Sequence, residues 1–448
     1  MSDIQIKLNE PAGSIRKLHG VNNGPICYGS LIDVTDYYKE AGIPLVRIHD
    51  PNWPHAWEVD IHTIFPDFDK DPEDPASYDF SRTDEYLQTI LDTGAKIVYR
   101  LGESIEHTKR KYYVHPPRDY AKWARICVNI IRHYNEGWAG GFRHGIEYWE
   151  VWNEPDLDER MWSGTPLQLF ELYETTAKAI KAHNPELKVG GYAAARPMLP
   201  FLTDFLNYCE ERKLPLDFFT WHTYTGDPYK IVQHARHVRS ELDSRGFLDT
   251  ESHLNEWNFL ESDFTKIWHR GNEYARKSNF DKQKNAHGAA FTATVLTLLQ
   301  DERVDAANYY DGQPTALFCG LFDYHGVPQK TYYTFKAFQR MTELSSRIRT
   351  VIDDKTGGVC AVAGTQEDGS GAVLITGYGA SVRLHTVRWE GQESAYTVQI
   401  YSIDDDHRFD LRKEQRVEPG EELSWLLPAY SVTLLEWSPS TPARPAGE

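Results

Sequence analysis

Several residue types and patterns are scarce in this sequence, and each shortage excludes a class of protein. Only five of the 448 residues are Cys, scattered without C-x-x-C spacing, so free buried thiols are favoured over disulfides or a zinc site. Lys and Arg number 48 against 66 Asp and Glu, which gives a net charge of −18. No basic tract occurs, so binding to nucleic acid or to an anionic membrane is disfavoured. The cysteines are Cys27, Cys127, Cys209, Cys319 and Cys360.

Long apolar segments and phosphate-binding loops are also absent. No stretch suits a transmembrane helix, and the first residues contain neither a basic leader nor an apolar core, which predicts a cytoplasmic protein in a reducing compartment. No glycine-rich phosphate loop occurs, and His49, His55 and His62 lack the spacing of a zinc site. We therefore expect no cofactor, no metal, and no nucleic-acid or membrane partner. An oligomer remains possible.

Aromatic residues, by contrast, are abundant, at 13% of the chain with 13 Trp and 26 Tyr. Most are expected to fill a large core, for which 40% hydrophobic residues suffice. The remainder are expected to line a groove, because a flat apolar face with a polar edge suits a sugar ring.

Strand-like apolar runs alternate with helix-like stretches up to about residue 340. This alternation is typical of parallel β/α units. Eight such units predict a closed (β/α)₈ barrel, an α/β fold that we place at residues 15–340. The predicted strands are residues 18–22, 44–49, 95–101, 146–152, 187–191, 216–222, 252–256 and 304–310.

The sequence changes character after residue 340, where short β runs are separated by Gly and Asp turns. This pattern predicts an accessory β-sandwich at residues 341–438, joined by an N-terminal strand within residues 1–14. Residues 50–80 form the longest insertion of the barrel. They are rich in Pro and Asp and contain Trp53 and Trp57, which suits an ordered loop at the active face.

Two glutamates follow strand-like runs inside the β/α series. Glu154 ends the run Tyr-Trp-Glu-Val-Trp-Asn-Glu-Pro, and Glu256 lies in Leu-Asn-Glu-Trp-Asn. The Asn-Glu pairs that end at Glu10, Glu136 and Glu273 lie in other contexts, so the dipeptide alone is weak evidence. In a (β/α)₈ barrel the carboxyl ends of the strands form the active face. Glu154 and Glu256 are therefore the candidate catalytic pair.

Paired carboxylates at one face are the groups that hydrolyse a glycosidic bond. One protonates the leaving oxygen, and the other acts as an ionised nucleophile when the two are about 5 Å apart, which gives retention of configuration. The nucleophile's charge is expected to raise the pKa of the acid. Two alternatives remain: a non-catalytic glycan-binding barrel, which would have no use for both acids, and an endo-acting hydrolase. The 50–80 loop favours a pocket and therefore exo action.

These features together resemble glycoside hydrolase family 39, over most of the chain. The matching segments are VRIHD (46–50), YWEVWNEPDL (148–157), WHTY (221–224), LNEWN (254–258), GLF (320–322) and HGVPQK (325–330). The resemblance implies that Glu154 is the acid/base and Glu256 the nucleophile. It also implies that Asn153 holds the 2-hydroxyl of the reacting sugar, in a subsite lined by the side chains of His49, His222 and Tyr224. Asn255 and Trp257 depart from the family pattern, where Thr and a smaller aromatic are usual.

The same resemblance implies a glycoside or oligosaccharide substrate, with β-xylosides first and arabinosides, galactosides, glucosides or uronides as alternatives. Arg47 is expected to be buried and already paired, which favours a neutral sugar over a uronide. Trp257 and Tyr310, at the ends of two strands, are further candidates for substrate contacts. Trp53, Trp57 and Trp268 would either stack on sugars or pack loops, and Glu103 would bind a hydroxyl or lie at the surface.

Overall fold

The computed structural model describes residues 3–53, 56, 58–157, 159–261, 264–314, 318, 320–353 and 357–440, without the side chains of residues 264 and 265. His55, Trp57 and Cys319 lie outside these residues. The remaining cysteines, Cys27, Cys127, Cys209 and Cys360, are buried and free, as expected.

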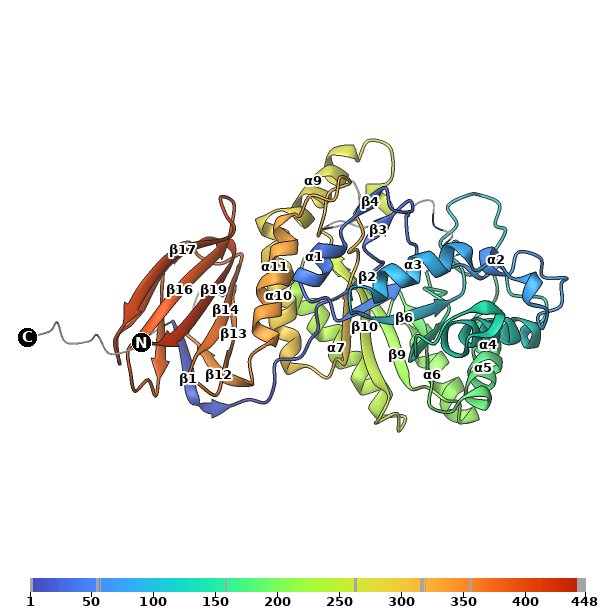
Figure 1. Cartoon of the computed structure of the whole chain (residues 1–448), viewed down its shortest axis with the longest axis horizontal. Coiled ribbons are helices and arrows are strands. Elements are labelled where there is room, and N and C mark those ends of the chain that lie inside the picture. The colour runs from blue at the N-terminus through green and yellow to red at the C-terminus, as the bar shows by residue number, and fades with distance from the viewer. Residues whose placement is uncertain are drawn as a thin grey trace, which may run out of the picture.

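A closed barrel of eight parallel strands forms the larger part of the molecule (Figure 1). Around the barrel the strands follow in the order β10, β11, β2, β5, β6, β7, β8 and β9, and β9 pairs with β10 to close it. Each strand overlaps one of the eight predicted runs, so the predicted barrel is confirmed. The strands are β2 (Gly20–Asn22), β5 (Leu45–Ile48), β6 (Lys96–Leu101), β7 (Tyr148–Val151), β8 (Lys188–Ala194), β9 (Phe218–Thr225), β10 (Glu251–Phe259) and β11 (Ala306–Tyr309).

Helices surround the barrel, and their ends follow local sequence signals. Thr165 and Gln168 form a capping box at the start of α5, with Pro166 in its first turn. Gly137 ends α4 in the left-handed conformation, with φ of 79°. None of the described helices is both long and apolar enough to cross a membrane. The helices are α1 (Thr35–Glu40), α2 (Ile61–Ile64), α3 (Ser81–Leu91), α4 (Tyr120–Glu136), α5 (Pro166–His183), α6 (Pro200–Arg212), α7 (Pro228–Asp243), α8 (Phe264–Ile267), α9 (Glu273–Lys284), α10 (Ala286–Leu298) and α11 (Lys330–Thr342).

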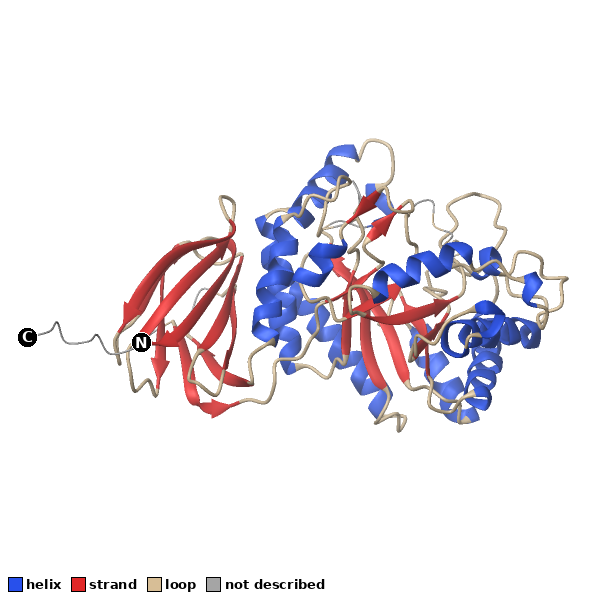
Figure 2. Ribbon diagram, viewed as in Figure 1, coloured by secondary structure: helices blue, strands red, loops and turns tan. Residues whose placement is uncertain are grey.

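A second, mostly antiparallel sheet is built from the C-terminal part of the chain (Figure 2). Its order is β17-β16-β19-β14-β13-β12-β1-β15-β18. Trp389 on β15 and Trp437 on β19 are far apart in that order, yet their ring centroids are 5.8 Å apart, so the sheet folds over a shared core. The strands are β1 (Ile4–Pro11), β12 (Ser346–Ile352), β13 (Val359–Thr365), β14 (Gly371–Tyr378), β15 (Arg383–Glu390), β16 (Tyr396–Ile403), β17 (Arg408–Val417), β18 (Leu423–Leu427) and β19 (Tyr430–Pro439).

The N-terminal strand β1 belongs to this sheet, although it lies at the opposite end of the sequence. It pairs antiparallel with β12, where Ile4 faces Ile352, and parallel with β15, where Ile4 faces Val387. Helices α10 and α11 lie between the barrel and the sheet (Figure 1). The α10 sequence is apolar on all sides because both of its faces are covered.

The insertion after β5 is anchored at the carboxyl ends of the barrel strands. The short helix α2 begins there, and the N–H of Ile61 donates to the carbonyl of Gly102, just after β6. A two-stranded hairpin, β3 (Ile26–Cys27) and β4 (Ile32–Asp33), follows β2 at the same end of the barrel. These segments build up the wall around the candidate active site.

Candidate active site

Glu154 lies just beyond the end of β7, in a backbone turn that directs its carboxyl group into the barrel mouth. Trp152 and Glu154 both have left-handed backbone conformations, with φ of 70° and 44°. Such conformations are uncommon for residues other than glycine and concentrate at functional sites. The N–H of Glu154 donates to the carbonyl of Ala193 at 3.0 Å, which holds the turn against β8.

Glu256 is placed by an irregularity in β10. Leu254 faces Trp221 on β9 and Glu256 faces the next residue, His222, so Asn255 is an extra residue in β10. A bulge of this kind re-aims side chains. Asn255 Nδ2 donates to Glu150 inside the barrel, and Glu256 also points inward to meet Arg47. The bulge therefore brings two successive polar side chains to the barrel interior.

The two predicted glutamates come together around His222. Glu154 Oε1 is 2.7 Å from His222 Nδ1, and Glu256 Oε2 is 3.5 Å from the same nitrogen. Oxygens of the two carboxyl groups lie within 4.8 Å of each other. Burial lowers the pKa of His222 to about 4, so its ring is neutral near neutral pH.

Glu256 is held at both oxygens. Arg47 Nη1 donates to Oε1 at 2.8 Å, and the Tyr224 hydroxyl donates to Oε2 at 2.6 Å. Arg47 also binds Glu150 at 2.7 Å and Asn153 Oδ1 at 2.5 Å, all fully buried. Burial alone would lower the pKa of Arg47, but Glu150 and Glu256 raise it above its ordinary value. The guanidinium thus compensates buried charge on the carboxylates and fixes their orientation.

Glu154 has a different environment. Burial, and next the negative charge of Asp156, raise the pKa of Glu154 to about 7. Asp156 is itself fixed, because its carboxyl group accepts the backbone N–H groups of Ala195 and Arg196 at 3.0 and 2.9 Å. The expected cause, the charge of Glu256, is thus not among the leading contributions. One carboxyl group is tuned to hold a proton near neutral pH, and the other is paired with a cation.

A cavity of about 500 Å³ opens over the two acids. On one side, Trp53 of the insertion after β5 and Trp268 after α8 have ring centroids 5.5 Å apart and close the rim. On the other side lie residues that follow β7, β8 and β9. The described lining residues include His49, Asp50, Trp53, Ile105, His107, Glu154, Leu157, Ala195, Arg196, Tyr224, Lys230, Glu256, Leu260, Glu261, Trp268, Tyr310 and Phe318.

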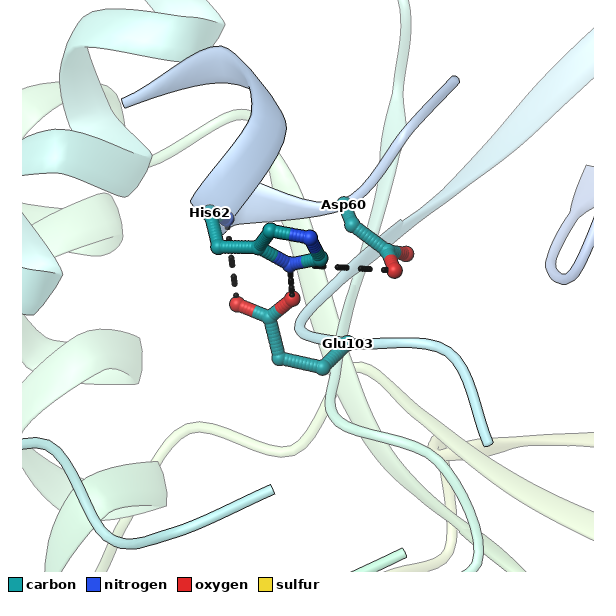
Figure 3. Close-up of side chains that lie close together, drawn as sticks. All are labelled: Asp60, His62 and Glu103. Atoms are coloured by element: carbon teal, nitrogen blue, oxygen red, sulfur yellow. Dashed lines mark hydrogen bonds and ion pairs between the residues drawn. The ribbon is translucent and has the colours of Figure 1, made fainter. Parts of the chain in front are cut away.

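A second polar cluster, formed by Asp60, His62 and Glu103, lies beyond the end of β6 (Figure 3). Glu103 binds His62 Nδ1 at 2.5 Å, and Asp60 lies 4.0 Å from the same atom. Burial raises the pKa of Glu103 to about 7. Arg100 Nη2 pairs with Asp60 at 2.7 Å, and its Nε donates to His49 Nδ1 at 3.0 Å. This network therefore fixes the His49 tautomer that carries its proton on Nε2, toward the cavity residue Asp50.

Among the described residues, two groups bring potential metal ligands within 4.8 Å: Asp60, His62 and Glu103, and the site residues Glu154, His222 and Glu256. The first group does not suit a cation, because Arg100 already neutralises Asp60 and would repel a metal ion. In the second group both carboxyl groups face the same nitrogen of His222, at 2.7 and 3.5 Å. The His222 Nε2 atom has no hydrogen-bond partner among the described residues.

Most of the predicted site residues meet here. His49, Tyr224 and Tyr310 line the cavity with both glutamates, and His222 bridges them. Trp257 does not: it is fully buried, and its ring packs against Tyr309 and Phe291 outside the strands. The prediction that Trp257 contacts substrate does not fit this placement, because the residue after an inward-facing Glu256 points outward.

Arg47 and Asn153 lie beneath the cavity rather than on its wall, and both are fully buried. Glu103 is neither exposed nor at the cavity, but buried against His62. Three contributors were missed by sequence reasoning: Glu150, Asp156 and Arg100. Glu150 could have been predicted, because a charged residue in the middle of an apolar strand of a buried barrel requires a partner.

Comparison with known proteins agrees with this geometry. The family model described as glycosyl hydrolases family 39 matches residues 33–375. A beta-xylosidase from Geobacillus stearothermophilus is 29% identical over 262 residues, covering 51% of this chain and 48% of the relative. A beta-xylosidase from Caldicellulosiruptor saccharolyticus is 27% identical over 322 residues, covering 64% and 61%. The chain therefore matches only about half to three-fifths of the length of these relatives.

Solved structures match over nearly the whole chain. A glucosidase from Croceicoccus marinus has a TM-score of 0.82 and 26% identity, covering 98% of this chain and 99% of that one. A monomeric beta-xylosidase from Caulobacter crescentus has a TM-score of 0.74 over 98% and 99% of the two chains, and at 17% identity it supports the fold alone. Since the family model covers well over half of the sequence, this protein belongs to glycosyl hydrolase family 39.

Proposed function

We propose that this protein is a retaining, exo-acting glycosidase that removes terminal β-xylosyl residues by double displacement. The observation that carries this proposal is the pair Glu154 and Glu256, whose carboxyl oxygens approach within 4.8 Å at the mouth of the barrel. This separation suits direct attack by a carboxylate rather than by an intervening water.

In the first step, Glu256 attacks the anomeric carbon while Glu154 gives its proton to the leaving oxygen. Arg47 and Tyr224 orient the two oxygens of Glu256 for this attack. The raised pKa of Glu154, about 7, keeps its proton available near neutral pH. In the second step Glu154, now ionised, removes a proton from water, which attacks the glycosyl-enzyme and releases the sugar with its original configuration.

Asn153 and the cavity wall support binding of the reacting sugar. Asn153 Oδ1 is occupied by Arg47, but its buried Nδ2 has no hydrogen-bond partner among the described residues. An unpaired buried donor is costly, so a sugar hydroxyl at C2 is a suitable acceptor for it. Asp50 and the Nε2–H of His49 would bind further hydroxyls. The Trp53–Trp268 contact closes one side of the cavity, which favours exo over endo action.

The choice of sugar rests on the relatives. Two curated relatives at 29% and 27% identity are beta-xylosidases, which favours a β-xyloside. The structure from Croceicoccus marinus, at 26% identity over almost the whole chain, is a glucosidase, so a β-glucoside is the second candidate. The two sugars differ by one hydroxymethyl group at C5.

A panel of aryl glycosides tests this proposal. We expect aryl β-xyloside to give the highest kcat/KM among xyloside, glucoside, galactoside, arabinofuranoside and uronide substrates. NMR of the first-formed product should show the β-anomer, which demonstrates retention. Inversion would contradict the double displacement, and lack of turnover across the whole panel would favour a non-catalytic glycan-binding protein.

The pH dependence should report the environment of Glu154. Because the general acid must be protonated, kcat/KM should fall as pH rises through a value near 7. Removing the Asp156 charge in Asp156→Asn should lower the pKa of Glu154 and move this basic limb to lower pH. The measurement is kcat/KM against pH with an aryl glycoside whose leaving group needs a proton.

Asp92→Asn is the matched control, since Asp92 is exposed where α3 ends, at the opposite end of the barrel. Its profile should overlay that of the wild type. A basic limb unchanged by Asp156→Asn would contradict the role assigned to Asp156.

A further inference from the structure

Two cations, Arg196 and Lys230, line one side of the cavity. Arg196 follows β8, Lys230 lies in the first turn of α7 after β9, and both line the cavity. Neither side chain makes a hydrogen bond or ion pair with any residue that the structure describes, and both are exposed. In a chain with 66 acidic and 48 basic residues, where many surface Lys and Arg contact a carboxylate, unpaired cations at a cavity wall indicate a ligand.

The position of Arg196 relative to Glu154 identifies which part of the substrate these cations would meet. The backbone N–H of Arg196 donates to Asp156, two residues after Glu154, so the start of the β8 loop is held beside the acid/base. A general acid protonates the leaving oxygen, so the leaving group lies against Glu154. In the barrel order, β9 lies across from β5, the strand before Trp53, and next to β10, the strand before Trp268.

Of the other charged groups near the cavity, Asp156 is close enough to Arg196 for the guanidinium to favour the ionised form of Asp156, although the two side chains form no ion pair. Glu261, at the end of β10, is ion-paired with Lys282. Asp50, Glu154 and Glu256 lie deeper, where the reacting sugar would bind. The cavity therefore has an acidic floor beneath the reacting sugar and a basic wall on the leaving-group side.

We propose, on the basis of the glycosidase function above, that Arg196 and Lys230 bind an anionic group on the leaving-group side of the scissile bond. The substrate class is a neutral terminal sugar linked to an aglycone, or to a next sugar, that bears a carboxylate or a sulfate ester. The guanidinium of Arg196 offers paired donors to two oxygens of either group, and the Lys230 ammonium adds a point charge.

Matched aryl substrates test this inference. Within the β-xyloside series, and the β-glucoside series in parallel, meta-carboxyphenyl is compared with meta-carbamoylphenyl, and meta-sulfophenyl with meta-sulfamoylphenyl. The readout is the ratio of kcat/KM for each charged substrate to that of its neutral partner. We expect this ratio to fall about threefold in Arg196→Gln and in Lys230→Gln, and about tenfold in the double variant, as for exposed ion pairs.

Comparing each variant with the wild type cancels differences between the leaving groups. Lys178→Gln on the outer helix α5 removes one surface charge away from the cavity and should leave the ratio unchanged. Added NaCl should lower the wild-type ratio and have little effect on the double variant. A fall for the carboxylate pair only, or for the sulfonate pair only, identifies which anion the site accepts.

Failure of this inference is distinct from failure of the proposed function. If the neutral substrates are hydrolysed but the charged-to-neutral ratio is the same in wild type and variants, the anionic subsite is refuted and the glycosidase stands. If neither member of any pair is hydrolysed in either series, the proposed function falls, and the subsite with it.

Discussion

Glu256→Ala is expected to lower turnover by about 10⁴- to 10⁶-fold with every leaving group, the largest effect of any single substitution in the site. Both chemical steps need this carboxylate, so an activated leaving group cannot restore activity. Azide, small enough to enter the space vacated by the carboxylate, should return a glycosyl azide of configuration opposite to that of the substrate. Product analysis by NMR measures both the loss and the configuration.

Glu251→Ala provides the matched control for Glu256→Ala. Glu251 lies at the other end of the same strand, where it pairs with Lys188 at 2.6 Å. Its loss perturbs β10 without reaching the cavity, so activity should stay close to that of the wild type. Near-normal turnover of an unactivated glycoside by Glu256→Ala would refute the assignment of Glu256 as nucleophile.

Glu154→Ala is expected to divide substrates by their leaving groups. Unactivated glycosides should lose about 10²- to 10⁴-fold in kcat/KM, the usual contribution of a general acid, while aryl glycosides with acidic phenols should still form the glycosyl-enzyme. Hydrolysis of that intermediate should then become slow, because no base activates water. A burst of phenol followed by a slow steady state, seen by stopped-flow absorbance, is the signature.

Azide again identifies the position of the missing group. In Glu154→Ala it should enter from the acid/base side and give a glycosyl azide with the configuration of the substrate. The two carboxyl groups lie on opposite faces of the sugar ring, so the two variants must give opposite products. The same configuration from both variants would overturn the assigned roles.

Much of the barrel, and the meeting of Glu154 and Glu256 at one face, could be predicted from the sequence, for a physical reason. Parallel strands buried on both faces are nearly continuous apolar runs, so a polar residue within or just after such a run is conspicuous. Glu154 and Glu256 interrupt such runs, so their positions alone predicted a shared face. Their separation could not be predicted, because it depends on the turn at Trp152 and on the bulge at Asn255.

Other features left weaker signals in the sequence. Strand β17 lies at the edge of the accessory sheet, and its sequence RFDLRKEQRV is mostly polar, so it was not predicted. Strands β12, β15 and β18 were also not predicted. The prediction for Trp257 relied on its position beside Glu256, whereas strand alternation turns its side chain away from the cavity. The tuning of Glu154 by Asp156 depends on the β8 loop, which no local pattern connects to β7.

The placement of β1 has a consequence for how the molecule is made. Ile4 pairs with Ile352 and Val387, so the ribosome delivers β1 long before either partner strand exists. During that interval the apolar side of β1, with Ile4 and Ile6, has no native cover, while the barrel strands meet near neighbours one after another. Closing so large a loop carries an entropic cost and slows assembly. The accessory sheet is therefore completed last, after the barrel has been fully synthesised.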